Sequence, residues 1–203
     1  MLKWQRRKDD RPDEILAAAL GLFVRKGFVS TTMDDIAKKA GVSKGTVYLY
    51  FPSKDSLFKT IVHELMVPKI AEVEVFIAAY EGSQSELLKL VISKWWTTVN
   101  SSGLAGIPKL ILTEADKFPA LTKLYVKEVI HRIQIILVTI INTGIQSKEF
   151  RRTDPVLSAR VIMSSLVYFS IWHITLKKYD QKDLTVENLI EQQIEIILNG
   201  IIK

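Results

Sequence analysis

The decisive stretch of the sequence runs from residue 32 to residue 54 and reads TMDDIAKKAGVSKGTVYLYFPSK. Thr32, with Asp35 three residues later, is a variant of the capping box and predicts the start of a short helix. Gly41 predicts the end of that helix, and Ser43 predicts the N-cap of a second helix that stops before Pro52. Two short helices joined by so tight a turn are typical of a helix-turn-helix unit.

The second of these helices has the residue types that a helix in the DNA major groove requires. Lysines supply positive charge, hydroxyl groups reach bases or phosphates, and a glycine lets the backbone approach the groove. On this pattern we expect DNA contacts from Lys44, Gly45, Thr46, Tyr48, Tyr50 and Lys54. Helix-turn-helix shapes also occur in purely structural domains, in which the two tyrosines would be core residues.

The positive charge of the chain is concentrated around this unit. The 203 residues carry a net charge of +6. Residues 1–60 contain 12 Lys and Arg against 7 Asp and Glu, whereas the remainder contains 16 against 15. A basic segment attached to a nearly neutral body suggests binding to a polyanion, although a solvated basic surface without a partner would have the same composition.

Composition excludes several other classes of function. The chain has no cysteine, which excludes a disulfide scaffold and a thiolate metal site, and its three histidines lie far apart. The segment 41–45 satisfies the G-x-S-x-G pattern of serine hydrolases, but a predicted helix precedes it where that motif requires a strand. Ser43 is therefore interpreted as an N-cap, and we expect no enzyme activity, no metal and no cofactor.

Apolar residues recur at helical spacing along nearly the whole chain, and strand alternation is nearly absent. We therefore predict an all-α fold of about nine helices, with a basic N-terminal arm at residues 1–11, a helix-turn-helix domain at 12–60 and a second helical domain at 61–203. The expected helices lie near residues 12–27, 32–41, 44–50, 54–80 with a kink at Pro68, 84–100, 105–115, 119–146, 155–178 and 185–201.

No segment has the character of a signal peptide or a membrane span. Acidic residues follow the basic residues at the N-terminus, where a signal peptide has an apolar run. The longest stretch free of charged residues, Val161–Leu176, is shorter than the roughly 18–20 residues that cross a bilayer. We expect a cytoplasmic protein without a membrane partner.

Residues 12 to about 60 closely resemble the N-terminal domain of TetR-family transcriptional regulators. The resemblance is carried by small and apolar residues of the first helix, by Ala40-Gly41-Val42-Ser43 and by Gly45-Thr46-Val47-Tyr48-Leu49-Tyr50-Phe51. The rest of the chain matches that family in architecture only. The resemblance implies a homodimer that binds a palindromic operator, mostly as a repressor. It also implies that a small ligand in the second domain moves the fourth helix and releases the DNA.

The same resemblance assigns roles within the reading unit. It implies phosphate contacts for Thr32 and Tyr50 and a phosphate clamp at Lys54. Tyr48 would lie on the DNA backbone side. The residues that would face the groove are Ser43, Lys44, Gly45 and Thr46.

Aromatic residues are frequent after residue 61, and large aromatics between helices can line an apolar cavity or fill a core. Since adjacent Trp95 and Trp96 cannot face the same way on a helix, one of them can point to a pocket. Our candidates for the pocket are Trp96, Phe118, Tyr125, Phe169 and Trp172. Glu114, Asp116 or Glu128 could supply a carboxylate to a cationic ligand.

The last two helices have more apolar positions than a peripheral helix needs, and two from each subunit could build a four-helix bundle. The alternative is that both helices are internal to a monomer. The expected interface residues are Val161, Ser165, Leu166, Ile190, Ile194, Ile197, Leu198 and Ile201.

Two functional interpretations follow. The first is a ligand-responsive DNA-binding regulator that a small apolar or aromatic effector of unknown identity releases from double-stranded DNA. The alternative is a DNA-binding architectural or protein-interaction factor with the same reading unit and no small-molecule switch.

Overall fold

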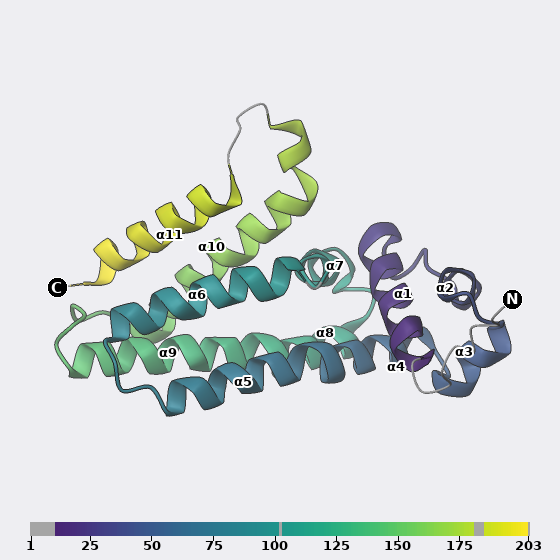
Figure 1. Cartoon of the computed structure of the whole chain (residues 1–203), viewed down its shortest axis with the longest axis horizontal. Coiled ribbons are helices and arrows are strands. Elements are labelled where there is room, and N and C mark those ends of the chain that lie inside the picture. The colour runs from purple at the N-terminus through teal and green to yellow at the C-terminus, as the bar shows by residue number, and fades with distance from the viewer. Residues whose placement is uncertain (1–10, 102, 181–184, 203) are drawn as a thin grey trace, which may run out of the picture.

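The computed structural model describes residues 11–101, 103–180 and 185–202, and Figure 1 shows an elongated molecule with the first helices gathered at one end. The described residues are helical apart from loops and one isolated β-bridge, between Phe150 and Ile202. The elements are α1 (Arg11–Lys26), α2 (Met33–Ala40), α3 (Lys44–Tyr50), α4 (Lys54–Thr60), η2 (Ile61–Met66), α5 (Val67–Ala78), α6 (Gln84–Ser101), α7 (Gly106–Glu114), α8 (Pro119–Tyr125), η3 (Val126–Ile130), α9 (His131–Gln146), α10 (Pro155–Thr175), η4 (Lys177–Tyr179) and α11 (Val186–Ile201).

The prediction of an all-α fold with about nine helices is confirmed. In the described part of the chain, α4, η2 and α5 form one uninterrupted helix, and so do α8, η3 and α9. Counted in this way, nine helices remain besides the short 3-10 turn η4. The predicted basic arm lies outside the described residues except for Arg11, where α1 begins. The predicted domain boundary at residues 60 and 61 falls inside a continuous helix.

The helix-turn-helix unit has the local structure that its sequence predicts. Thr32 and Asp35 form a reciprocal capping box at the start of α2, and the Ser43 hydroxyl accepts from the backbone N–H of Thr46 at the start of α3. Gly41 ends α2 with φ 67°, a left-handed conformation that favours glycine. Each helix of seven or eight residues is thus held at its end by its own side chains.

Pro68 changes the helix that contains it without ending it. A proline removes one backbone donor and crowds the carbonyl group four residues earlier. The turn before it, Ile61–Met66, is π-helical, and α5 continues from Val67 with the proline in its first turn. A second π-helical segment, Val126–Ile130, packs against the first. Both segments lie beside the cavity described below.

The end of the molecule that contains α1–α4 is joined to the helical body through α1 and α7. Gly106, at the start of α7, lies so close to α1 that a Cβ there would overlap Val24. Phe28, which follows α1, packs edge-on against Phe118 of the body with 4.6 Å between the ring centroids. It also contacts Phe58 of α4 at 6.1 Å. This apolar junction links the reading unit to the body.

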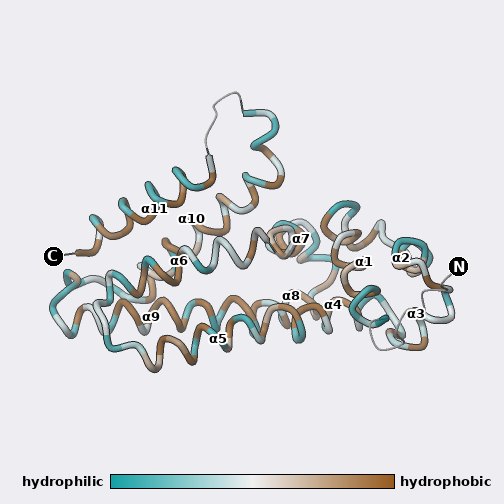
Figure 2. Tube along the Cα trace, viewed as in Figure 1, coloured by the Kyte–Doolittle hydropathy of each residue, from teal (hydrophilic) through white to brown (hydrophobic). Residues whose placement is uncertain are grey.

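Helix α9 lies at the centre of the body, and Figure 2 shows it hydrophobic along most of its length. It packs against α5, α6 and α10. A two-point ion pair fastens it to α5, because Arg132 Nε donates to Glu74 Oε1 at 2.8 Å while the other guanidinium arm binds Oε2. This hydrogen bond lowers the pKa of Glu74. Movement of α5 along α9 therefore has to break or carry this pair.

The start of α6 is tied to the loop before α10 by Glu149. The carboxylate accepts the backbone N–H groups of Gln84 and Ser85, both at 2.8 Å, and the hydroxyls of Ser83 and Ser85. Partial burial raises the pKa of Glu149, but these hydrogen bonds outweigh it and hold the pKa at about 2. The charged group satisfies two of the free backbone donors at the N-terminus of α6.

Glu149→Gln should lower the free energy of unfolding at pH 7 by about 2 kcal/mol, since hydrogen bonds to an ionised carboxylate contribute roughly 1.5–3 kcal/mol. The folded pKa lies below the ordinary value of 4.5, so this stabilisation is complete above pH 4.5 and is lost as the pH falls toward 2. Urea unfolding at several pH values measures the difference. Glu81→Gln, an exposed change in the loop before α6, is the control and should be neutral.

Candidate nucleic-acid interface and cavity

One side of α3 is available to a partner. Val47 is fully buried and fixes the orientation of the helix. At about 100° per residue, the positions directly opposite it are Gly45 and Leu49, and Leu49 is 76% exposed. These two positions define the outward line of α3. Lys44 and Tyr48 lie to one side of this line and are also exposed. Leu49 was absent from the expected contact residues, although its spacing from Val47 would have indicated its outward direction.

Lys44 forms an ion pair with Asp34 of α2, with 2.8 Å between Nζ and Oδ1. This hydrogen bond raises the pKa of Lys44, which remains charged. Both side chains are more than half exposed, so the pair contributes little to stability. Its effect is positional, because it holds the ammonium group beside the first turn of α3.

Two of the expected contact residues serve as helix caps in the free protein. The Thr32 hydroxyl donates to Asp35 Oδ2 at 3.0 Å, and the Thr32 N–H donates to the same oxygen at 3.1 Å. The Ser43 hydroxyl shares a 2.8 Å hydrogen bond with the Thr46 hydroxyl and accepts from the Thr46 N–H at 3.1 Å. The two caps and Thr46, which is also an expected contact residue, therefore have local structural partners.

Lys54 was expected to clamp a phosphate, and the structure gives it an internal role. Its Nζ donates to the carbonyl oxygens of Phe28 at 2.7 Å and Val29 at 3.2 Å. The ammonium also lies 4.9 Å from the centroid of the Phe28 ring. Partial burial lowers the pKa of Lys54. Two of its three donors hold the segment after α1. This lysine therefore stabilises the end of the molecule formed by α1–α4, the head, in the free protein.

The two tyrosines of α3 differ in their surroundings. Tyr48 is 45% exposed, whereas Tyr50 is half-buried and packs against the core. The structure thus brings Lys44, Gly45, Thr46 and Tyr48 to one accessible surface, and it leaves Tyr50 at the edge of that surface.

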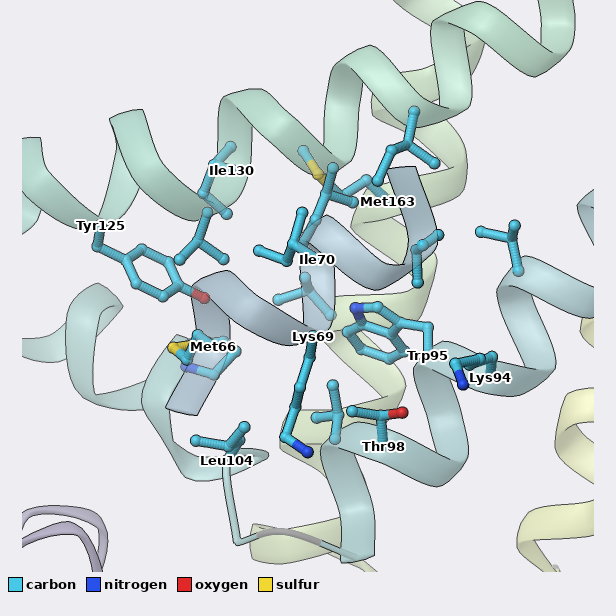
Figure 3. A pocket seen from close by; sticks show the side chains of 18 residues that line it. Met66, Lys69, Ile70, Lys94, Trp95, Thr98, Leu104, Tyr125, Ile130 and Met163 are labelled. Atoms are coloured by element: carbon cyan, nitrogen blue, oxygen red, sulfur yellow. The ribbon is translucent and has the colours of Figure 1, made fainter. Parts of the chain in front are cut away.

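A cavity of about 100 Å³ lies in the body between α5, α6, η3, α9 and α10 (Figure 3). Its lining is almost entirely apolar. The lining residues are Met66, Lys69, Ile70, Val73, Val91, Lys94, Trp95, Thr98, Val99, Leu104, Pro108, Tyr125, Val129, Ile130, Ile133, Ile136, Met163 and Val167.

The polar groups of this lining are few, and its charged groups all have one sign. Lys69 and Lys94 are exposed, and neither forms an ion pair with a described residue. Figure 3 shows the Tyr125 hydroxyl directed toward the interior of the lining. Burial raises the pKa of the Tyr125 phenol, which therefore keeps its proton at neutral pH. The cavity offers a neutral hydroxyl inside and two ammonium groups at its edge.

Most of the aromatic residues expected to line a pocket do not line this cavity. Tyr125 does, but Trp96 is buried on another side of α6, where its Nε1 donates to Gln193 Oε1 at 3.2 Å. Phe118 belongs to the junction with Phe28. Phe169 and Trp172 are half-buried elsewhere on α10. Of the two adjacent tryptophans, it is Trp95 that faces the cavity.

The acidic residues proposed for a cationic ligand are also absent from the lining. Glu114 pairs with Lys117, Glu128 pairs with Lys127, and Asp116 is exposed. The two lysines of the lining were missed because exposed lysines are common on helices and carry no spacing signal of their own.

Much of the expected dimer surface lies inside the subunit. Leu166, Leu198 and Ile201 are buried, and Ile190, Ile194 and Ile197 are half-buried and pack against the core. Gln193 Nε2 donates to the Ser165 hydroxyl at 2.8 Å, which ties α11 to α10. The apolar stripe of α11 is thus its core-facing side, as any amphipathic helix has.

A different apolar surface is exposed on α10. Leu157, Val161 and Tyr168 are 62%, 70% and 58% exposed and recur on one side of the helix, and Ile196 of α11 is 64% exposed. With 21 residues, α10 is long and apolar enough, by length and composition alone, to cross a membrane. Only 28% of its most apolar 18-residue segment is buried, so much of its apolar surface is accessible. It packs along α9, α7 and α6 as a body helix does. Val161 is the expected interface residue that lies fully on this surface.

In the part of the chain that the structure describes, no three metal-ligating side chains lie together. The features that remain are the exposed side of α3, the cavity and the apolar side of α10.

The chain is similar to known proteins in sequence and in fold. Residues 15–61 match the family described as "Bacterial regulatory proteins, tetR family". The chain is 28% identical over 199 residues to the fatty acid metabolism regulator protein of Bacillus subtilis, covering 96% of this chain and 98% of that one.

Two solved structures share the whole architecture. The transcriptional regulator FadR from Bacillus subtilis in complex with stearoyl-CoA superimposes with a TM-score of 0.72 at 27% identity, covering 93% of this chain and 98% of that one. The ketosteroid transcriptional regulator KstR2 of Mycobacterium tuberculosis gives a TM-score of 0.77 at 22% identity, covering 97% of each chain. The second likeness concerns the fold alone.

Gly45→Ala should stabilise the fold and weaken DNA binding at once. The nearest atom to an added Cβ is the Ser43 hydroxyl at 3.8 Å, so alanine fits, and it should raise the free energy of unfolding by up to about 1 kcal/mol. A methyl group on the outward line of α3 should lower affinity for the recognised duplex about tenfold by keeping the backbone from the groove. Thermal unfolding and fluorescence anisotropy measure the two effects. Equal affinity of both proteins would contradict the assigned surface.

Proposed function

The chain is a TetR-family DNA-binding transcriptional regulator, and we propose from this that it is a repressor whose release from its operator is caused by an anionic ligand with a long apolar part. The observation that carries the proposal is the apolar cavity with two lysines at its edge, one of them on the helix that continues into the reading unit. A bacterial regulator of this kind acts in the cytoplasm.

The cavity and the reading unit share one helix. Met66, Lys69 and Val73 line the cavity from η2 and α5, while Leu57 and Phe58 of α4 are buried in the core of the head. Because the helix from α4 to α5 is uninterrupted, a ligand that displaces its cavity end also displaces its head end. Such a shift changes the distance between the two reading helices of a dimer and so the fit to two half-sites.

The size of the cavity supports a coupled mechanism. A volume of about 100 Å³ is smaller than the roughly 300–1,000 Å³ of typical ligand pockets. A ligand with a long apolar part must therefore move a wall in order to enter. A ligand shifts an equilibrium only when it binds one state better, and a cavity that has to widen provides this difference.

The charge of the lining supports an anionic ligand. Lys69 and Lys94 place two positive charges at the edge, and none of the described residues that line the cavity is an aspartate or a glutamate. The Tyr125 hydroxyl can donate to an acceptor inside. The related FadR structure holds stearoyl-CoA, which combines an apolar acyl chain with an anionic carrier. We infer that this chain binds a ligand of the same chemical class.

The first experiment selects an operator from random duplexes with the full chain and then adds ligands. Stearoyl-CoA should release the DNA, whereas coenzyme A without an acyl chain should not. The double substitution Lys69→Glu with Lys94→Glu should raise the required concentration of stearoyl-CoA about tenfold, because two attractive charges become repulsive. Affinity for DNA without ligand should be unchanged. Fluorescence anisotropy measures both quantities.

Lys123→Glu is the matched control, since Lys123 is an exposed lysine of α8 outside the cavity lining. It should leave the release concentration unchanged. Release by an uncharged steroid but not by stearoyl-CoA would contradict the anionic class. DNA binding without release by either probe, and without thermal stabilisation of the free protein, would favour the factor that lacks a small-molecule switch.

We also propose that the chain acts as a homodimer through the exposed side of α10. Leu157, Val161 and Tyr168 form an apolar stripe, and Ile196 of α11 adds to the exposed apolar surface. An exposed apolar stripe on one side of a helix is typical of a subunit interface. A two-fold dimer would also present two α3 helices to a palindromic site.

Leu157→Asp with Val161→Asp should convert the protein to a monomer and abolish tight operator binding, because each side chain would place a buried charge in the interface. Sedimentation velocity at micromolar concentration measures the association. Leu112→Asp changes a residue of α7 that is 69% exposed, and it should leave the dimer intact. A wild-type protein that stays monomeric would remove the proposed interface.

A further inference from the structure

The outward line of α3 is apolar, although polar residues surround it. Gly45 and Leu49 occupy the two positions opposite the buried Val47 and are separated by one helical turn. Leu49 has the highest exposure, 76%, among the large apolar residues of the described chain. The most exposed large apolar side chain on this side of α3 therefore offers no hydrogen bond.

The groove that α3 enters contains a single kind of apolar group. Base edges in the major groove present donors and acceptors, and the C5 methyl group of thymine is their one apolar feature. We propose that Leu49 reads a thymine in each half-site by packing against this methyl group. This inference rests on the proposed operator binding and adds a specificity-determining residue to it.

The neighbours of Leu49 support this contact. Gly45 has no side chain, and an added Cβ would meet nothing closer than 3.8 Å, so the surface beside Leu49 is low and open. Lys44 and Tyr48 lie on one side of the line, and the Lys44 ammonium is drawn toward Asp34 of α2. Charged and hydroxyl groups therefore border the leucine without covering it. The contact is short-ranged and requires the close approach that Gly45 permits.

The test removes single methyl groups from the DNA. The operator is first selected with the wild-type full chain, and each thymine is then replaced in turn by deoxyuridine, which lacks only the C5 methyl. One symmetry-related pair of thymines should be sensitive. Its replacement should weaken wild-type binding about fourfold per half-site, the value for burying one methyl-sized group. Fluorescence anisotropy at constant salt gives the affinities.

Leu49→Ala should bind the thymine and deoxyuridine duplexes equally, since the side chain that senses the methyl is gone. Its melting temperature should match that of the wild type because the leucine is exposed. Ile135→Ala, a change at a 64% exposed position of α9, should keep the full difference between the duplexes.

The outcomes separate this inference from the proposed function. A wild-type protein that selects no duplex would overturn operator binding itself. A selected operator at which no deoxyuridine matters, or at which Leu49→Ala keeps the wild-type sensitivity, would overturn the role of Leu49 alone. The deoxyuridine scan on wild-type protein gives this answer even if the variant is unstable.

Discussion

The continuous helix from Lys54 to Ala78 is the constraint on which the rest of the structure depends. Its first part is buried in the head through Leu57 and Phe58, and its later part lines the cavity through Met66, Ile70 and Val73. Neither core can change shape without moving the other. The ion pair between Glu74 and Arg132 fastens the same helix to α9. Movement of this helix relative to α9 must therefore break or shift that ion pair.

The junction between head and body adds a second restraint. Gly106 allows α7 to lie directly against Val24 of α1, and Phe28 packs between Phe58 of the head and Phe118 of the body. Lys54 holds the backbone of Phe28 from the start of α4. Both the continuous helix and the junction therefore contact the segment after α1. A shift at the cavity can reach the helix-turn-helix unit through these packed, mostly apolar side chains.

Local signals predicted the fold well. The capping residues Thr32 and Ser43, the left-handed Gly41 and the helical spacing of apolar residues act within a few positions of the chain, so they can be read without knowing the tertiary structure. One helix was predicted from residue 54 to residue 80 with a kink at Pro68, and the structure has a continuous helix from Lys54 to Ala78. The π-helical turn at Ile61–Met66 was not foreseen, because a proline in a sequence predicts that the helix before it is disturbed but not which hydrogen-bond pattern that turn adopts.

Features that depend on which side of a helix faces the core were predicted less well. Trp95 and Trp96 are adjacent in sequence, and only the packing of α6 decides that Trp95 lines the cavity. The apolar stripe of α11 was interpreted as a dimer surface because an isolated amphipathic helix does not say whether its apolar side meets its own body or a partner. The assignment of Lys54 to a phosphate contact stays a prediction, and the sequence carried no sign of its additional contact with the Phe28 carbonyl oxygen.

The apolar side of α10 also has a consequence for how DNA occupancy depends on the concentration of the protein. A lone subunit exposes Leu157, Val161 and Tyr168 to water, which favours self-association and capture by proteases or chaperones. If two subunits must join before two reading helices engage one site, occupancy at low abundance rises with the square of the subunit concentration. The regulated promoter would then respond to the amount of the protein over a narrower range than a monomeric regulator allows, and dilution at cell division would release it more sharply.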